Sequence, residues 1–306
     1  SSTVDSRYPQ VATQPFLTSS FTDTDMTLTG GSNSYFLSWA NVFGKLFMAA
    51  GKAANNALFQ ETSVTDPTPA AVTFTPTNSV YGLWPIFIGG STSLERLLVG
   101  VEAGANTVVL NSSLTSDGTM GYSAITGFIQ TQLSNYTMLI LEGAFMVSLN
   151  VTNAITDTGS IVLSNVPIGG YDVGVVALNG APRACWVWPR ASIGGQHALN
   201  FGDLSKGDIV LTNLDGTNPT PITHLLGLDF VYHCFLWRDG IVASDGRRWV
   251  FYNGRVNRDL HIFEDRTPNS NVDYQIVSGW ANGAELVSLN NLIQGLNGSY
   301  TTTAEV

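Results

Sequence analysis

Short segments of large apolar and β-branched residues recur along most of this chain, and each is bounded by Gly, Pro, Asn or Asp. The turn signals follow one another about every 8 to 15 residues, and strands do not alternate regularly with long helices. This spacing favours an all-β sandwich or barrel over a parallel α/β fold. The predicted strands cover residues 72–76, 80–89, 95–102, 106–113, 136–152, 160–166, 171–178, 184–189, 207–213 and 273–280.

The stretch from Asp229 to Phe263 is the most strongly patterned. An aromatic strand over 230–237 has two mainly apolar faces, so we expect packing on both sides. A second strand, 248–252, lies between a Ser-Asp-Gly turn and Asn253-Gly254, a signal for a two-residue hairpin. A core hairpin with solvated turns explains the pattern, and a subunit contact is the functional alternative. The candidate contact residues are Arg238, Arg247, Arg248, Trp249 and Arg255.

Three segments carry helical spacing in place of alternation. Apolar residues recur every three or four positions within 35–60, so a helix is predicted over part of this segment. Two glycines weaken a single uninterrupted helix, and a helical turn at 35–42 followed by a strand is the alternative. Short helices are also predicted at 123–134 and 285–296.

The two ends of the chain differ in composition from the rest. Residues 1–34 are rich in Ser, Thr and Asp, which predicts an extended N-terminal arm with a short strand at Met26–Thr29. Residues 35–306 are predicted to form one β-sandwich domain with long loops, in which a weak seam near 155–180 could separate two lobes. The last six residues are expected to fray, and we detect no internal repeat at a fixed period.

Charge is scarce in this chain. Only 12% of the residues are charged, the net charge is −10 and the sequence pI is about 4.6. Hydroxyl and amide groups supply most of the polarity, so packing against other subunits would require little charge desolvation. Clustered Lys and Arg are missing, which argues against strong nucleic-acid binding through a basic arm. No apolar run reaches the roughly 18 residues of a membrane span.

The sequence lacks the patterns of common catalytic and metal sites. Its four histidines have no ligand partner at metal-binding spacing. Cys185 and Cys234 lie in apolar, aromatic strands, so buried free thiols are expected, with a single disulfide as the alternative. Nucleophile-elbow, Walker and dinucleotide-binding glycine patterns are missing. We therefore predict no catalytic residue, no metal and no cofactor.

Paired carboxylates are the chemistry hardest to exclude, because glycoside hydrolysis needs two acids about 5 to 10 Å apart on separate strands. The acids in predicted strands are Glu95, Glu102, Glu142 and Asp172. Exposed tryptophans could stack on sugar rings, although large aromatics in strands are usually core residues. The candidates for such stacking are Trp186, Trp188 and Trp249.

Two stretches resemble segments of the jelly-roll capsid proteins of small non-enveloped, picornavirus-like RNA viruses. SYFLSWANVFGKLF, residues 34–47, is similar to the short helix that leads into a core strand in those coats. FLWRDGIVASDGRRWVFY, residues 235–252, is similar to their aromatic Trp-Arg-Gly strand and turn. The charge-poor composition, the arm before the first strand and the missing initiator Met extend the resemblance to the whole chain.

The resemblance implies an antiparallel, eight-stranded jelly-roll sandwich without catalytic activity. It implies assembly with copies of itself and sister capsid proteins into an icosahedral shell, hence a virion formed in the host cytoplasm, with a host receptor as a further partner. Cleavage of a polyprotein would account for Ser1. Two alternatives stay open: a secreted or surface β-sandwich that binds carbohydrate, such as an adhesin or fibre head, and a glycoside hydrolase.

Overall fold

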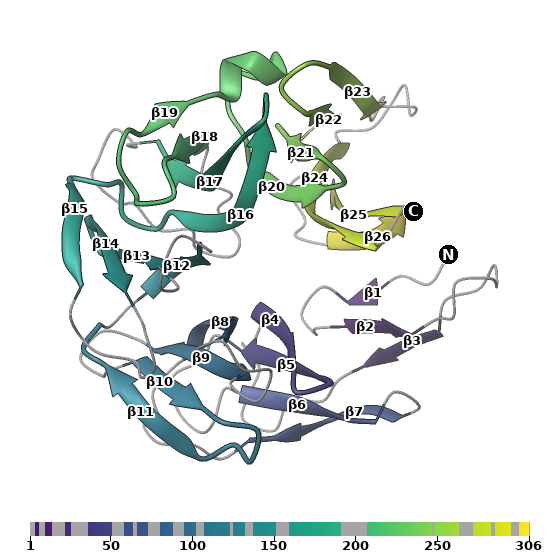
Figure 1. Ribbon diagram of the computed structural model, residues 1–306. Helices are drawn as coiled ribbons and strands as arrows, with labels where there is room; N and C mark the ends of the chain where they lie inside the picture. The colour runs from purple at the N-terminus through teal and green to yellow at the C-terminus, as the bar shows by residue number, and fades with distance from the viewer. Residues whose placement is uncertain are drawn as a thin grey trace.

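The computed structural model is almost entirely β-structure, drawn as arrows in Figure 1. The described residues contain no α-helix, and their one helical turn is the 3-10 turn η1 (Thr223–Leu226). The prediction of an all-β fold built from antiparallel strands is therefore confirmed. The structure describes residues 4–5, 10–13, 22–25, 36–50, 58–63, 66–72, 80–87, 95–101, 107–122, 125–131, 137–150, 159–190, 207–246, 248–262, 272–282, 285–294 and 300–305.

Within these ranges the strands form six four-stranded sheets and one two-stranded sheet, all antiparallel. The sheet at the chain ends has β24 (Val272–Asn282), β25 (Glu285–Gln294), β26 (Tyr300–Glu305) and β1 (Val4–Asp5), and the two-stranded sheet has β2 (Gln10–Thr13) and β3 (Thr22–Asp25). The next three sheets comprise β4 (Phe36–Val42), β5 (Lys45–Ala50), β6 (Leu58–Ser63) and β7 (Asp66–Ala71); β8 (Val80–Phe87), β9 (Glu95–Val101), β10 (Thr107–Leu110) and β11 (Ser116–Met120); and β12 (Ile125–Gln130), β13 (Thr137–Glu142), β14 (Phe145–Asn150) and β15 (Ser160–Ser164). The last two comprise β16 (Tyr171–Leu178), β17 (Ala181–Pro189), β18 (Gly207–Thr212) and β19 (Thr220–Pro221); and β20 (His233–Trp237), β21 (Gly240–Ser244), β22 (Arg248–Tyr252) and β23 (Asn257–Ile262).

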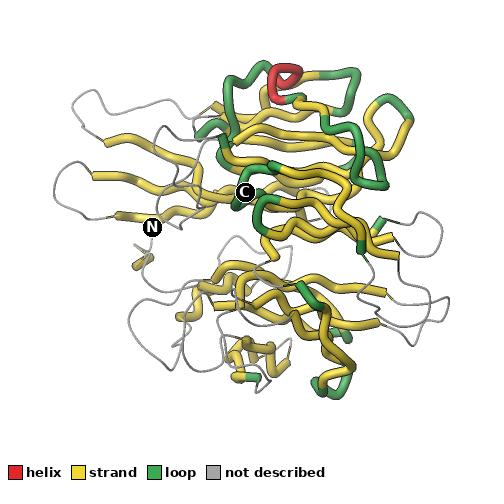
Figure 2. Tube along the Cα trace, turned by 90° about the vertical axis from the view of Figure 1, so that its left-hand side faces the viewer, coloured by secondary structure: helices red, strands yellow, loops and turns green. Residues whose placement is uncertain are grey.

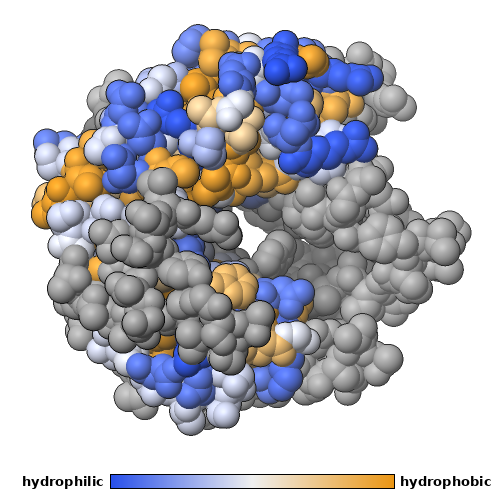
Figure 3. Space-filling view, viewed as in Figure 1, coloured by the Kyte–Doolittle hydropathy of each residue, from blue (hydrophilic) through white to orange (hydrophobic). Residues whose placement is uncertain are grey.

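The sheets stand around a common centre. The first strand of each sheet from β4 to β24 contacts the first strand of the next, in the order β4, β8, β12, β16, β20, β24. Figure 1 shows these strands innermost, and the side view in Figure 2 shows strands running roughly along the viewing direction of Figure 1. Figure 3 shows a hollow near the centre of the same face. This radial arrangement of four-stranded sheets is that of a β-propeller.

The strand order is an up-and-down meander. Within each sheet from β4–β7 to β20–β23, consecutive strands are hydrogen-bonded neighbours, whereas a jelly roll would place strands far apart in the sequence side by side. The exception is β1, which pairs with β26 and so brings both chain ends into one sheet. Neighbouring sheets pack face to face as in a β-sandwich, and this packing is repeated from the sheet β4–β7 to the sheet β20–β23.

A structural repeat, which the sequence analysis did not detect, underlies this arrangement. The first strands of four successive sheets begin at Phe36, Val80, Ile125 and Tyr171, which are about 45 residues apart, whereas the next two begin at His233 and Val272. The repeat is one of strand and turn positions, and the residues that fill these positions differ from sheet to sheet. A search for recurring residues therefore does not detect it.

Hydrophobic side chains fill the spaces between neighbouring sheets. In β13, Met138 and Ile140 pack toward the sheet β8–β11, while Leu139 and Leu141 pack toward the sheet β16–β19. Because both faces are covered, inner strands read as continuous apolar runs. The outermost strands are more exposed, as Ser116–Thr119 of β11 are.

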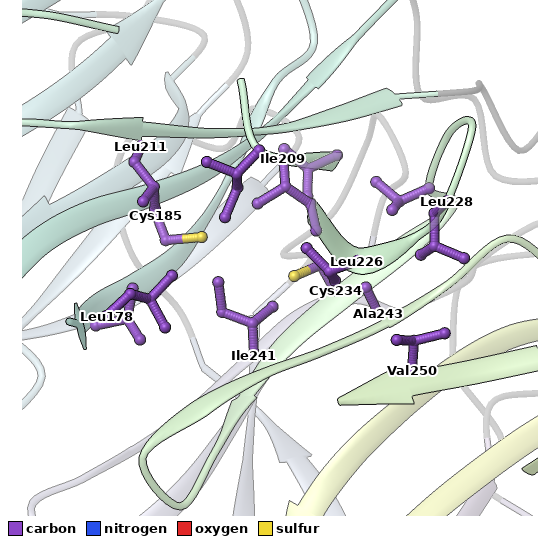
Figure 4. Close-up of a cluster of buried hydrophobic side chains, with 14 residues drawn as sticks. Leu178, Cys185, Ile209, Leu211, Leu226, Leu228, Cys234, Ile241, Ala243 and Val250 are labelled. Atoms are coloured by element: carbon purple, nitrogen blue, oxygen red, sulfur yellow. The ribbon is translucent and has the colours of Figure 1, made fainter. Parts of the chain in front are cut away.

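Figure 4 shows a third interface, between the sheets β16–β19 and β20–β23. The side chains of Cys185 and Cys234 enter it from the two sides, with their sulfur atoms directed toward each other. Both cysteines are free and buried, which confirms the prediction of buried free thiols. Their environment is apolar, and burial raises the pKa of the Cys234 thiol.

The predicted helices are strands, which corrects that part of the sequence analysis. Residues 35–60 contain β4, β5 and the start of β6, residues 123–134 contain β12, and residues 285–296 contain β25. In β12 the apolar residues Ile125, Phe128 and Ile129 have helical spacing. A β-bulge between Ile125 and Gly127 shifts the register, so Ile125 and Phe128 share one face although they are three residues apart.

The chain ends also take part in the sheets. Residues 1–34 include β1, β2 and β3, and the predicted strand at Met26–Thr29 lies outside the described residues. The tail that was expected to fray forms β26, which pairs with β25. An N-terminal arm separate from the main domain, and a seam near 155–180, stay predictions.

Candidate functional site

The predicted contact residues divide into two groups in the sheet β20–β23. Trp249 and Arg248 lie on β22, whose predicted bounds of 248–252 are confirmed. Trp249 is 5% exposed and packs in an aromatic cluster, with its ring centroid 5.4 Å from that of Phe235. A side chain this deeply buried stabilises the sheet and offers little surface to a partner.

Arg248 is held by its own sheet and by η1. Its guanidinium lies 3.3 Å from Asp259 Oδ1 and 3.6 Å from Asp245 Oδ2, and Nη2 donates a hydrogen bond of 2.6 Å to the carbonyl of Gly227. These contacts join β22, β23 and the turn after η1. We therefore assign Arg248 to the internal structure of this sheet, and Arg247 lies outside the described residues.

The other two candidates, Arg238 and Arg255, are exposed on neighbouring turns. Arg238 lies between β20 and β21, with its guanidinium carbon 4.2 Å from the ring centroid of Trp237. Arg255 lies in the four-residue connection between β22 and β23, longer than the predicted two-residue turn. Asn253 Nδ2 in this connection donates a hydrogen bond of 3.0 Å to Asp239 Oδ2, which ties the two turns together. The two linked turns place two predicted contact residues at the same end of the sheet, beside the exposed side chain of Val256.

A second surface, which the sequence analysis did not single out, lies on the sheet β12–β15. Three large apolar side chains are exposed there: Phe145 by 42%, Ile161 by 60% and Ile168 by 47%. Phe145 begins β14, and Ile161 in β15 pairs with Val147, two residues further along β14. Ile168 follows Val166, whose N–H donates to the carbonyl of Ala144, so it lies near the same end of the sheet.

We call the side chains of Phe145, Ile161 and Ile168, together with the strand β15, the β15 surface. Figure 3 shows apolar residues gathered at the left edge of the molecule, where Figure 1 places β15. The sequence signal for this surface is the uncharged segment SIVLS at 160–164. It was interpreted as an ordinary strand, because the sequence does not show which strand is outermost.

A third feature lies among the innermost strands of the sheets: the carboxylate of Asp172 on β16. Its Oδ1 accepts a hydrogen bond of 2.9 Å from Trp84 Nε1 on β8 and one of 3.2 Å from the backbone N–H of Phe128 on β12. One oxygen thus links the first strands of three consecutive sheets. Burial raises the pKa of this carboxyl from 3.8 to about 6, against the opposing effect of the two hydrogen bonds.

Two glycines position the indole of Trp84. Gly82 on β8 and Gly100 on β9 are register partners, and the Trp84 ring lies over both of them. A Cβ atom at position 82 would come within 2.1 Å of that ring, and one at position 100 within 2.8 Å. The absence of side chains at these positions lets the indole lie flat against the strands, with its N–H directed to Asp172.

Two of the acids considered for glycoside hydrolysis, Glu95 and Glu142, lie at opposite ends of neighbouring sheets. Glu95 pairs with Phe87 where β8 ends, whereas Glu142 pairs with Ile125 where β12 begins. Asp172 lies on β16, the innermost strand of its sheet, and Glu102 lies outside the described residues. Across the described ranges, no three His, Cys, Asp or Glu side chains gather as metal ligands would.

The candidates for sugar stacking are mostly core residues. Trp186 is fully buried and donates a hydrogen bond of 3.1 Å from Nε1 to Thr212 Oγ1, and Trp249 is buried as described above. Trp188 is half-buried. Within the described part of the chain, no helix has the length and hydropathy of a membrane span.

Comparison with known proteins gives likeness in shape alone. No protein-family model and no curated protein matches the chain. Among solved structures, it is similar to the extracellular domain of a one-component system from B. thetaiotaomicron at 9% identity and a TM-score of 0.44, where 90% of this chain covers 39% of that one. It is also similar to BBS1N in complex with ARL6DN at 13% identity and a TM-score of 0.43, covering 93% of this chain and 81% of that one.

A third similar structure is the WD40 domain of SCAP from fission yeast, at 9% identity and a TM-score of 0.42, with 93% of this chain and 76% of that chain covered. This chain thus spans about two fifths of the bacterial protein and about four fifths of the other two. At identities and TM-scores this low, the activities and partners of those proteins cannot be inferred for this chain.

Proposed function

We propose that this chain is a structural protein that assembles with copies of itself, and that the β15 surface is part of the contact. The observation that supports this is the grouping of exposed apolar side chains. Of the seven large hydrophobic residues that are exposed in the described ranges, three belong to this surface. Burying a large apolar side chain contributes about 1.5 to 3 kcal/mol, so exposed groups of this kind mark interaction sites.

The scarcity of charge supports the same proposal. With 12% charged residues, much of the surface carries hydroxyl and amide groups, which pack against another subunit at a lower desolvation cost than ionised groups. Arg238 and Arg255, exposed on the adjacent turns of the sheet β20–β23, are candidates for a second, polar contact. A chain with two separate contact surfaces can extend an assembly beyond a dimer.

A virus shell built with sister coat proteins is the assembly that the sequence resemblance implies, and it remains the specific form of this proposal. In that setting the protein would be located in the virion. The sheets would then form the repeating subunit of the shell, and the exposed surfaces would make the contacts between subunits.

Sedimentation velocity of the purified chain over a wide concentration range tests the proposal, with negative-stain imaging of the heaviest fractions. We expect a mass that increases with concentration and, for a coat protein, closed particles of uniform size. A single species of 32.7 kDa at every concentration would overturn the proposed function.

A further inference from the structure

We propose that Cys185 and Cys234 form a disulfide when the chain folds in the presence of a small-molecule disulfide, and remain two thiols when it folds without one. The bond would join the sheet β16–β19 to the sheet β20–β23. The inference goes beyond the proposed function and does not depend on it, because it concerns the interior of a single subunit. It is carried by the placement of the two sulfur atoms, by their apolar surroundings and by their burial.

The two cysteines face each other across one interface. Cys185 lies on β17 and Cys234 on β20, and both belong to the cluster of buried side chains between the two sheets. Figure 4 shows that their sulfur atoms enter this cluster from opposite sides and point toward each other. Burial, and after it the neighbouring Cys185 thiol, raise the pKa of the Cys234 thiol. The sequence contains only these two cysteines, so each has a single possible partner within the subunit.

The surroundings of the pair are compatible with a bond between the sheets. The other buried members of the cluster are all aliphatic, among them Ile209, Ile241 and Ala243, and hydrophobic contacts have no preferred direction. These side chains can therefore adjust as the two sulfur atoms approach to about 2 Å, the length of the bond. Antibody domains have a disulfide in this kind of position, between two sheets that pack face to face.

The bond forms by two exchange steps with an oxidant of the glutathione disulfide class. In the first step, the thiolate of one cysteine attacks a sulfur atom of the oxidant, which gives a mixed disulfide and releases one glutathione thiolate. In the second step, the other cysteine thiolate attacks the protein sulfur atom of the mixed disulfide and releases the second glutathione. The two cysteines are oxidised, the oxidant is reduced to two thiols, and the two protons of the cysteines pass to these thiols.

Burial limits this reaction to the time of folding. In the folded chain Cys185 is 0% and Cys234 is 3% exposed, so an oxidant of this size does not reach them. The attacking species is the thiolate, and burial disfavours it. In the unfolded chain both thiols are accessible, and the second exchange step occurs as the two sheets pack together. The native protein with two thiols should therefore resist an oxidant that closes the bond during folding.

The first test measures the number of free thiols after folding. The chain is denatured with reductant and refolded, either in a mixture of reduced and oxidised glutathione or in reduced glutathione alone. The folded fraction is then unfolded and alkylated, and its intact mass is determined. We expect no alkyl group per chain after the first treatment and two after the second. Cell-free synthesis of the chain in the same two mixtures gives this readout without a refolding step. Alkyl groups or bound glutathione on the chain after oxidative folding would overturn the proposal.

The native protein with two thiols is the control for the role of folding. It is placed in the same mixture of reduced and oxidised glutathione for the same time, and we expect two alkyl groups per chain. Formation of the bond at an equal rate in the native protein would overturn the requirement for folding.

The second test measures what the bond does to stability. The cysteines are 49 positions apart, so the bond restricts the unfolded chain over a long loop. We expect oxidative folding to raise the melting temperature by on the order of 5 °C. Cys185→Ala and Cys234→Ala each keep one thiol and serve as matched controls, and their melting temperatures should be the same after both treatments. An equal shift in either variant would show that the bond is not its cause. An unchanged melting temperature of the cross-linked chain would show that the native interface does not accommodate the bond, and either result would overturn the proposal.

Discussion

Replacing Asp172 with Asn should stabilise the protein at neutral pH. Asn keeps an oxygen that can accept the hydrogen bonds from Trp84 Nε1 and the Phe128 N–H, at 2.9 and 3.2 Å in the unsubstituted chain. It removes the negative charge that burial disfavours. The substitution therefore separates the cost of the charge from the value of the two hydrogen bonds.

The size of the effect follows from the pKa. Burial raises the pKa of the Asp172 carboxyl from 3.8 to about 6, and each unit corresponds to about 1.4 kcal/mol. The folded state thus binds the proton more tightly than the unfolded chain. The contribution of Asp172 to the free energy of unfolding is therefore largest below about pH 4. It decreases as the pH rises to about 6, and above that pH it is constant. The full shift corresponds to about 3 kcal/mol, and because the side chain is half-buried we expect about 1 to 3 kcal/mol.

Urea unfolding of both proteins at several pH values between 4 and 8 measures this difference. We expect Asp172→Asn and the unsubstituted chain to have similar free energies of unfolding near pH 4, and the variant to be more stable above pH 6.5. If the difference in stability between the two proteins does not change with pH, folding does not shift the pKa of Asp172, and the reasoning from burial is refuted.

Asp208→Asn is the matched contrast, because its pH dependence has the opposite sign. Arg190 donates two hydrogen bonds to this carboxylate, at 2.7 and 2.9 Å, and they hold the pKa of Asp208 below its ordinary value. This stabilisation is present above pH 4 and is lost as the pH falls through the lowered pKa. We expect the variant to lose about 0.5 to 1 kcal/mol at pH 7, since the pair is partly exposed, and to approach the unsubstituted chain as the pH falls through the lowered pKa. An equal loss at every pH would show that the ion pair is not responsible.

Two further predictions concern the aromatic residues. Trp249→Ala should lower the free energy of unfolding by about 3 to 5 kcal/mol, whereas Arg255→Ala should change it by less than about 0.5 kcal/mol. Thermal unfolding distinguishes the two variants. Equally small shifts of the melting temperature in both would contradict the buried position of Trp249. Gly82→Ala should cost about 1 to 3 kcal/mol, because the new Cβ would displace the Trp84 ring, and near-ultraviolet circular dichroism should report the altered indole environment. An unchanged spectrum and stability would show that the ring can move away freely.

Many individual strands could be predicted from the sequence. The predicted segments 80–89, 95–102 and 171–178 correspond closely to β8, β9 and β16, since apolar runs bounded by turn residues mark strands wherever they pack. The buried state of the two cysteines followed from their apolar neighbours in the same way. The contact residues were harder to predict. Arg238 and Arg255 lie on neighbouring exposed turns, but Trp249 faces the core. Alternation along a strand does not show which side of it another sheet will cover.

The sequence by itself determined that the chain is built from short antiparallel strands with little charge, because local patterns of apolar and turn residues specify strands without reference to the rest of the fold. Only the tertiary structure decided how those strands group. The helical spacing of Ile125 and Phe128 arises from a bulge that appears once β12 is paired with β13. Likewise, the outermost place of β15 and the meeting of Trp84, Phe128 and Asp172 depend on which sheets are neighbours. Contacts between residues 44 to 88 positions apart have no signature in the local pattern that specifies each strand.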